Sequence, residues 1–431
     1  MHRGPHRATA GLVAALSVAA AAQAADYRFE LAEIEAKPWE LGGFVEGKAE
    51  HLRLAPQAAL YPLSFGGTPP RHTLDRATAT LELAGTFKQG PFTAYGRVDG
   101  IAVTDALRTN STGRVLEAGV RASPTEGLSF DLGKQVQRWG KGYAWNPVAF
   151  FERPKDPNDP QQSREGFVMA SADAVRSLQG AVAAIGFTPV LLPTSGDLNR
   201  DYGERGNGNP GARLYALVAD TDIDLLWAAK GSRPQRIGLD FSRNFGSQLE
   251  VHGEWARAIG AIRRELAAGG AVTTRRSHLD SALLGLRYLT DNEVTWIVEF
   301  YRNGAGYDDV QLARFYDLLD SAFAPGGTPA QQAQASSLAQ SGFGRSNPGR
   351  HYAYLRASAK DPFDWLYVNP ALTVIVNLDD RSFQLTPEVV HSGWQNVELR
   401  ARAVWLHGKA SSEFSAKPAQ RRVEASAKFY F

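Results

Sequence analysis

The chain of 431 residues carries a formal net charge of +2, which is too small to indicate a nucleic-acid partner. It contains no cysteine, so disulfide bonds and thiolate metal sites are excluded. With 42 glycines, 10% aromatic residues and only 2 methionines, the composition favours strands and turns over helices. After the N-terminal segment, no stretch reaches the roughly 18 consecutive apolar residues that indicate a transmembrane helix.

The first 24 residues predict a secretory signal peptide. Arg3 and Arg7 precede an apolar run over 11–22, and the segment ends in the small-x-small sequence Ala-Gln-Ala. A membrane anchor is the weaker alternative, because the run is shorter than the ~20 apolar residues of a spanning helix. No Pro/Ser-rich linker divides the remaining chain, so we expect residues 25–431 to form one domain.

The rest of the chain repeats one pattern, in which apolar and polar residues alternate over short runs. Such alternation is typical of strands with one apolar face. Most runs match the ~9–11 residues of a tilted strand that crosses a bilayer. We predict an all-β fold, a single antiparallel transmembrane β-barrel of about eighteen strands, with sixteen as the alternative. The runs are 39–54, 73–87, 91–105, 114–123, 127–137, 171–178, 181–193, 211–220, 223–231, 236–244, 247–258, 279–289, 293–302, 351–361, 365–378, 382–390, 394–407 and 421–431.

The links between these runs alternate in length. Those after even-numbered strands are short, whereas most after odd-numbered strands are long, namely 55–72, 138–170, 194–210, 259–278, 303–350 and 408–420. Short periplasmic turns opposite longer external loops are the asymmetry expected of an outer-membrane barrel. An even strand number also leaves both termini on the periplasmic side.

The longest link, 303–350, is expected to contain helices. Apolar residues recur at helical spacing over 309–323, and a Pro-Gly-Gly sequence then ends the pattern before an Ala/Gln-rich stretch over 329–340. We predict a short helical hairpin, which either caps the mouth of the barrel externally or plugs its lumen.

Charged residues collect on one face of the predicted strands. An Arg or Lys that faces lipid at the bilayer midplane costs ~2–4 kcal/mol, so this face must line the channel. Eleven basic residues fall on it: Arg76, Arg97, Arg121, Lys230, Arg236, Arg287, Arg356, Arg400, Arg402, Arg422 and Lys428. Twelve acidic residues do the same: Glu82, Asp99, Glu117, Asp131, Asp224, Asp240, Glu250, Glu254, Glu299, Glu388, Glu398 and Glu424. The lining is therefore balanced in charge, which suits cross-strand pairing or a mixed-charge pore.

Three tryptophans, Trp39, Trp365 and Trp394, fall near the ends of predicted strands. Tryptophan is enriched where a membrane protein meets the headgroup region. We therefore expect outer-membrane lipid and lipopolysaccharide as the surroundings of the barrel.

The link 138–170 opens with the densest group of aromatic, charged and proline residues in the chain. Its candidates for pore constriction or ligand contact are Arg138, Trp139, Lys141, Tyr143, Trp145, Asn146, Phe151, Glu152, Arg153, Lys155 and Asp156. The Gly-x-Gln strand that runs into Trp-Gly and Asn-Pro resembles a loop of the alginate-export-like and related porin-like outer-membrane proteins, over about 25 residues. The resemblance implies a channel for export or diffusion. The loop either folds inward as a constriction or lies outside as a cap.

Catalytic and metal-binding patterns are not evident. Asp156, Asn158 and Asp159 lie between prolines and do not form an EF-hand sequence, and the 9 histidines include no His-Glu-x-x-His pair. We predict no enzyme, no cofactor and no metal. The predicted function is an outer-membrane channel, either a diffusion pore or the outlet of an export system with an inner-membrane or periplasmic partner. The alternative is a non-conducting surface barrel that binds or anchors polysaccharide.

The last nine residues alternate strictly and place Phe429 and Phe431 on the apolar face. A terminal aromatic strand of this form resembles the C-terminal assembly signal of bacterial outer-membrane barrels. The resemblance implies recognition by the barrel-assembly machinery. Since a long apolar edge strand is rarely left unpaired, we also expect the last strand to close the sheet.

Overall fold

The computed structural model describes residues 37–66 and 68–431. All the described helices and strands lie within Trp39–Phe431. The predicted signal peptide, residues 1–24, lies outside the described residues. No helix in the described part of the chain is long and apolar enough to cross a membrane.

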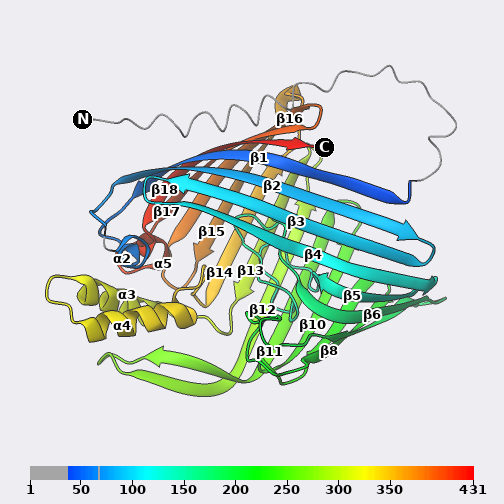
Figure 1. Cartoon of the computed structure of the whole chain (residues 1–431), viewed down its shortest axis with the longest axis horizontal. Coiled ribbons are helices and arrows are strands. Elements are labelled where there is room, and N and C mark those ends of the chain that lie inside the picture. The colour runs from blue at the N-terminus through cyan, green and yellow to red at the C-terminus, as the bar shows by residue number, and fades with distance from the viewer. Residues whose placement is uncertain (1–36, 67) are drawn as a thin grey trace. The chain divides into compact units, whose positions relative to one another are not determined.

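Eighteen antiparallel strands form one closed sheet (Figure 1). Each strand pairs with its neighbours in sequence, and β1 also pairs with β18, so the sheet has no free edge. The predicted fold class and strand number are therefore confirmed. The strands are β1 (Trp39–Leu54), β2 (Thr73–Gln89), β3 (Phe92–Asp105), β4 (Thr109–Thr125), β5 (Leu128–Gln135), β6 (Phe167–Ser177), β7 (Val182–Leu191), β8 (Pro210–Val218), β9 (Thr221–Ala228), β10 (Gln235–Phe245), β11 (Leu249–Leu266), β12 (Val272–Leu289), β13 (Val294–Arg302), β14 (His351–Ala359), β15 (Val368–Asn377), β16 (Phe383–Trp394), β17 (Val397–His407) and β18 (Ala419–Tyr430).

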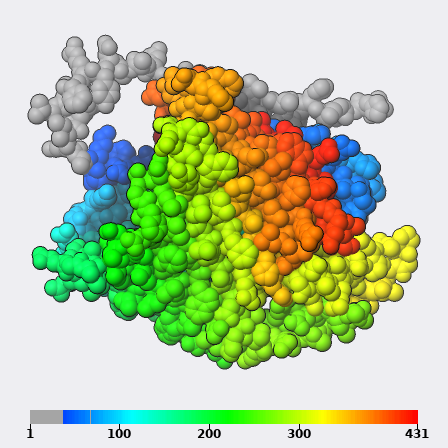
Figure 2. All heavy atoms as spheres, turned by 180° about the vertical axis from the view of Figure 1, so that it is seen from behind, coloured from blue at the N-terminus to red at the C-terminus, as the bar shows by residue number. Residues whose placement is uncertain are grey.

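Alternation along the strands separates an outer face from an inner face. Leu81, Phe87 and Val98 of β2 and β3 are exposed on the outer face, while the polar residues between them point inward. Exposed apolar side chains also occur on later strands, for example Leu239, Phe300 and Trp405. Figure 2 shows the opposite side of the barrel, where the strands coloured from green to red lie. A belt of exposed apolar side chains matches the lipid-facing surface of a transmembrane barrel.

The C-terminal residue completes the closing seam between β18 and β1. The backbone N–H and C=O of Phe431 each bond to Gly43, both at 3.0 Å. The position of Gly43 leaves no room for a larger residue, because an added Cβ would collide with the backbone carbonyl of Glu82. The terminal aromatic strand is thus part of the closed sheet, as its pattern predicts.

Short and long links gather at opposite ends of the barrel (Figure 1). One predicted long link, 259–278, is wrong: β11 continues to Leu266 and β12 begins at Val272. The extension includes a shift in register between Ala258 and Ala261, where Gly260 adopts φ +67°. A bulge inserts a residue into a continuing strand, so the glycine marks an irregularity and not an end.

Helices occupy the end with the long links: α2 (Tyr61–Phe65), α3 (Asp309–Phe323), α4 (Pro329–Leu338), η3 (Ala339–Phe343) and α5 (Glu413–Ala416). The predicted hairpin is confirmed as α3 and α4. Asp308 caps α3, and Thr328 forms a capping box with Gln331 at the start of α4. The apolar residues of this hairpin pack against Leu266 at the tip of β11 and against Ala416 of α5. The hairpin therefore caps the rim, and its packing partners are rim segments.

The three tryptophans of the predicted girdle are all exposed at the end with the short links. Trp39 begins β1, Trp394 ends β16, and Trp365 follows the short helix η4 (Pro362–Asp364) between β14 and β15. This placement agrees with an interfacial position for the tryptophans.

Candidate functional site

The link between β5 and β6, residues 136–166, lies against the inner face of the barrel, and we call it the inner loop. Its aromatic residues are buried: Trp139 meets Phe151 edge to face at 5.3 Å, and Phe150 is fully buried. The wall makes room for them with glycine. A Cβ at Gly238 of β10 would lie 3.0 Å from the ring of Phe150. The loop and the wall are thus complementary in shape.

A carboxylate of β11 holds the start of the inner loop through its backbone. Glu254 accepts the N–H groups of Lys141 at 2.7 Å, Gly142 at 2.5 Å and Val148 at 3.2 Å. Gly140 allows this approach, since it adopts φ +95° and a Cβ there would press on the carboxylate. Hydrogen bonds to a charged acceptor are stronger than those between neutral groups, so Glu254 is a firm anchor.

A second carboxylate, on β13, binds the next two residues in the same way. Glu299 accepts hydrogen bonds from the backbone N–H groups of Tyr143 and Ala144, the latter at 2.8 Å. His252 Nε2 lies 2.9 Å from a Glu299 carboxylate oxygen. The Glu299 side chain is fully buried. Without the loop these oxygens would lose their donors, which is the costly state for a buried charge.

The register of the sheet explains why this side of the barrel needs the loop. Asp240 of β10 lies directly opposite Asp224 of β9 and directly opposite Glu254 of β11. We call these three residues the carboxylate row. Like charges opposite one another destabilise a sheet. Lys141 of the inner loop compensates, with its Nζ 3.0 Å from Asp224 and 3.9 Å from Asp240.

An aromatic cluster fixes the middle of the loop to β13 and β14. The Trp145 ring stacks on Tyr301 at 5.1 Å and also meets Tyr352 and Tyr354. Tyr143 lies beside Tyr354 at 6.0 Å. Aromatic pairs of this kind add roughly 0.5–1.5 kcal/mol each beyond the area they bury.

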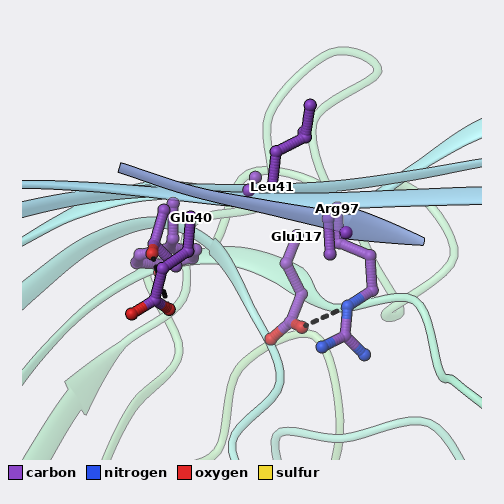
Figure 3. Close-up of a pocket in the computed structure, with 10 residues that line it drawn as sticks. Glu40, Leu41, Arg97 and Glu117 are labelled. Atoms are coloured by element: carbon purple, nitrogen blue, oxygen red, sulfur yellow. Dashed lines mark hydrogen bonds and ion pairs between the residues drawn. The ribbon is translucent and has the colours of Figure 1, made fainter. Parts of the chain in front are cut away.

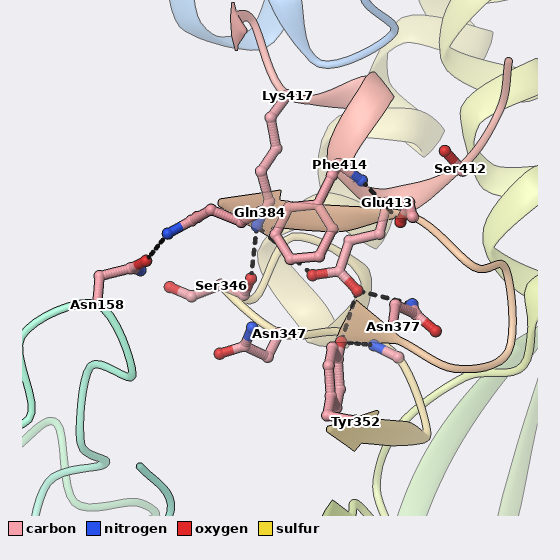
Figure 4. Close-up of polar contacts among 12 residues, drawn as sticks. Asn158, Ser346, Asn347, Tyr352, Asn377, Gln384, Ser412, Glu413, Phe414 and Lys417 are labelled. Atoms are coloured by element: carbon pink, nitrogen blue, oxygen red, sulfur yellow. Dashed lines mark hydrogen bonds and ion pairs between the residues drawn. The ribbon is translucent and has the colours of Figure 1, made fainter. Parts of the chain in front are cut away.

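The tip of the loop reaches the wall formed by β16 and β17. Asn158 accepts a hydrogen bond from Gln384 through its side chain (Figure 4). Its carbonyl accepts another from Arg402 at 3.1 Å. Since the loop starts at β5 and also contacts β9 to β14, it crosses the lumen. These contacts favour the inward-folded alternative over the external cap.

Charged side chains within the loop are mostly paired. Glu152 contacts Arg164 and accepts a hydrogen bond from Asn146 at 3.2 Å. Burial raises the pKa of Glu152 to about 7, although Arg164 opposes this shift. Burial also lowers the pKa of Lys155, which donates to the Gly142 carbonyl at 2.5 Å.

The remaining loop candidates fall at its edges. Arg153 binds Asp201 in the link between β7 and β8 and lies over the ring of Phe167. Arg138 and Asp156 are exposed. Asp156 shapes the tip by accepting the backbone N–H of Asn158 at 2.9 Å.

Along the rest of the inner face, predicted lining residues meet one another as ion pairs. Figure 3 shows Arg97 and Glu117 pointing to the same side as Glu40, opposite to Leu41. The pairs include Arg97 with Glu82 at 3.9 Å and Glu117 at 3.7 Å, Arg121 with Asp131 at 2.7 Å, Arg76 with Asp105 at 3.3 Å, Arg356 with Glu388 at 3.1 Å, Arg400 with Glu398 at 3.2 Å, and Arg402 with Glu424 at 3.0 Å.

Some members of this arrangement were not among the expected residues. Arg114 pairs with the predicted Asp99. Strict alternation from Glu117 predicts that Arg114 faces outward, but a shift in register between Arg97 and Val98 places Arg114 opposite Asp99. Tyr95 donates to Asp131 at 2.6 Å. Arg287 forms no ion pair with any of the described residues.

A second buried polar group lies at the rim with the long links. Glu413 of α5 accepts hydrogen bonds from Tyr352 at 2.6 Å and Asn377 at 2.8 Å, and Lys417 lies 3.5 Å away (Figure 4). Burial raises the pKa of the Glu413 carboxyl. These contacts join α5 to β14 and β15 and so stabilise the rim.

Comparison with known proteins adds little to this geometry. No family model matches the chain, and no curated protein matches it. Two engineered variants of the porin of Rhodopseudomonas blastica are similar in structure. One is 10% identical with a TM-score of 0.44, and the other is 11% identical with a TM-score of 0.43. Each match covers 91% of this chain and 100% of the porin. These likenesses are too distant to carry an argument, so the description of the barrel rests on its own strand pairing.

Among the described residues, no group of three or more His, Asp or Glu side chains is arranged to hold a metal ion.

Proposed function

We propose that this barrel is an outer-membrane channel whose lumen is narrowed by the inner loop. The observation that carries the proposal is the pair of buried carboxylates, Glu254 and Glu299, that accept loop N–H groups. A loop bound to these carboxylates, on the inner wall, reduces the cross-sectional area of the lumen. The apolar outer face supports a position in lipid, with lipopolysaccharide on the outer side.

The proposed channel could serve either of two transport roles. The channel serves as a diffusion pore, or as the outlet of an export system with an inner-membrane or periplasmic partner, as the resemblance to alginate-export-like proteins implies. The contacts of the loop favour the diffusion pore. A loop tied to β9–β14 and again to β17 leaves a narrow passage for small solutes and little room for a polymer. Assembly would depend on the barrel-assembly machinery and on the terminal strand that ends at Phe431.

The alternative role, a non-conducting barrel that binds polysaccharide on an aromatic platform, has less support. A platform needs aromatic rings that a sugar can reach. Trp139, Trp145 and Phe151 are buried against the barrel wall and against one another.

Single-channel recording in planar bilayers tests the proposal. Deleting Gly142–Pro157 should raise conductance several-fold, because the current through a pore depends steeply on its narrowest section. The matched control deletes Gln331–Gln340 from the rim hairpin and should leave conductance close to that of the full chain. A folded barrel that never conducts would contradict the channel. Equal conductance of the full chain and the loop deletion would contradict the constriction.

A further inference from the structure

Acidic and basic residues are nearly equal in number on the inner face, but they differ in exposure to the lumen. Consider the arginine–carboxylate and lysine–carboxylate pairs within and between β17, β18 and β1–β5. In each of these pairs the cation is the more exposed partner. The Arg121 side chain is 54% exposed and that of Asp131 is 4% exposed; the values are 40% and 5% for Arg114 and Asp99. A solute in the lumen therefore meets guanidinium groups before carboxylates.

Side-chain length explains the difference. An aspartate on a strand keeps its charge close to the wall, where neighbouring residues cover it. An arginine carries its charge further on an apolar stem and turns its head toward water. Tyr95 adds to the cover over Asp131, since its hydroxyl donates to that carboxylate at 2.6 Å.

The opposite wall does not restore negative charge to the lumen. Asp224, Asp240, Glu254 and Glu299 are buried, and the inner loop lies over them with Lys141 and its backbone N–H groups. Carboxylates paired in this way contribute little field to the open passage. Among these paired residues, the basic groups are consequently more accessible from the lumen than the acidic groups.

One guanidinium of this surface has unused donors. No hydrogen bond joins Arg97 to any of the described residues, and its two carboxylate neighbours lie at 3.7 Å and 3.9 Å. It borders a hollow of about 360 Å³ whose lining also includes Glu40 and Glu117 (Figure 3). Gly42 and Ala84 lie beside Arg97 in the register of the sheet, and their small size leaves the approach to its guanidinium open.

We propose that Arg97, Arg114 and Arg121, the guanidinium strip, bind small solutes that carry a carboxylate or phosphate group. The guanidinium fork matches both groups and can bind them through two parallel hydrogen bonds. Rows of arginine confer anion selectivity on pores in general. The inference rests on the proposed channel and names the class of its substrate.

The decisive variant removes equal numbers of both charges. It combines Arg97→Gln, Arg114→Gln and Arg121→Gln with Asp99→Asn, Glu117→Gln and Asp131→Asn. Net charge stays the same, and the carboxylates paired with the three arginines are removed with them, except Glu82, which loses its 3.9 Å contact with Arg97. If only the charge count matters, selectivity is unchanged. If exposure matters, the variant loses its anion preference.

Reversal potentials in a potassium chloride gradient provide the measurement. The full chain should pass chloride several-fold more readily than potassium, and the six-fold variant should bring this ratio close to one. Arg257→Gln is the matched control, because Arg257 pairs with Asp280 on the same outer face as Trp255. It should leave the ratio unchanged. Retention of anion preference by the six-fold variant, or its absence from the full chain, would overturn the inference.

Added anions test binding directly. Millimolar succinate or inorganic phosphate should reduce the chloride current of the full chain and have less effect on the six-fold variant, with glucose as the neutral control. Block by succinate alone assigns carboxylates, and block by phosphate alone assigns phosphates. Block by neither contradicts the inference. A barrel that conducts without anion preference refutes this inference alone, whereas a folded barrel that conducts nothing refutes the proposed channel.

Discussion

Two parts of the inner wall handle buried carboxylates in different ways. On β9–β11 the carboxylate row places Asp240 directly opposite both Asp224 and Glu254. Apart from Arg213 of β8, which lies 3.8 Å from Asp224, the donors come from a loop distant in sequence. On β3–β5 each carboxylate has an arginine on a neighbouring strand, as Glu117 has Arg97 and Asp131 has Arg121. The carboxylates of the first wall depend on the inner loop for most of their partners, whereas those of the second wall have their partners within the sheet.

This difference assigns separate roles to the two walls. In the proposed channel, the acidic wall positions the constriction, because the loop supplies Lys141 and the backbone N–H groups that pair with its carboxylates. The arginine wall faces the proposed passage. Under this proposal one side sets the width of the pore, and the other sets its selectivity.

The strongest test of the comparison removes the cation of the acidic wall. Lys141→Met removes the cation that lies 3.9 Å from Asp240 and leaves Asp224 with Arg213 of β8, at 3.8 Å. Breaking a buried pair typically costs about 3–5 kcal/mol. We expect a clearly lower urea midpoint for the refolded barrel and a larger, noisier conductance. Adding Asp240→Asn should recover part of the loss. Lys409→Met, at an exposed position in the link before α5, is the control and should behave like the full chain.

Equal stability of Lys141→Met and the full chain would contradict the dependence of this wall on the loop. The same conclusion would follow if the added Asp240→Asn change gave no recovery.

A smaller effect is expected from steric displacement of the loop. A Cβ at Gly211 of β8 would overlap the Phe151 ring and lie 2.8 Å from the carbonyl oxygen of Trp227. Overpacking of this kind typically costs 1–3 kcal/mol, so Gly211→Ala should lower the unfolding midpoint and loosen the constriction. Gly96→Ala is the matched control on β3, where an added Cβ meets nothing within 4 Å. Similar midpoints for the two variants would argue against a loop packed on β8.

The sequence predicted the barrel well because strand alternation is a local property. Each run from 39–54 to 421–431 corresponds to one observed strand, and an even strand number agreed with the lengths of the links. The errors arose where local signals mislead. The predicted run 247–258 ends where the alternation is interrupted, whereas pairing with β12 continues β11 through the bulge to Leu266.

The site was harder to predict because it depends on register and on distant contacts. The residue types around Trp139 marked the loop, yet nothing local indicates that Glu254 and Glu299 bind its backbone. The alternation of β9, β10 and β11 placed their carboxylates inward, but only the pairing shows that three of them share one row. The sequence also could not predict how exposed each charged side chain is, since a count of charges treats Arg121 and Asp131 as equal.

The smallest expected effect is a pH dependence of the loop. Burial raises the pKa of Glu152 from 4.5 to about 7, so the folded loop binds more protons than an unfolded loop between these two pH values. Docking is therefore favoured at lower pH and weakens as the pH rises through about 7. We expect a slightly higher and noisier conductance at pH 8 than at pH 5.

Glu152→Gln should remove this dependence and keep the conductance of the pH 5 state. The control, Asp156→Asn, alters an exposed carboxylate of the same loop and should retain the dependence. A pH response that persists unchanged in Glu152→Gln would show that another group titrates.

The central claim is that the inner loop crosses the lumen, and cross-linking tests it most directly. The chain has no cysteine of its own, so introduced thiols are the only ones present. Asn158→Cys and Gln384→Cys place thiols at the contact between the loop tip and β16. A short bifunctional thiol reagent should link them in the folded barrel with little change in conductance. Asn158→Cys with Ala333→Cys, on the rim helix α4, should not be linked. Linkage to position 333 in place of 384 would place the loop outside the lumen and contradict the account.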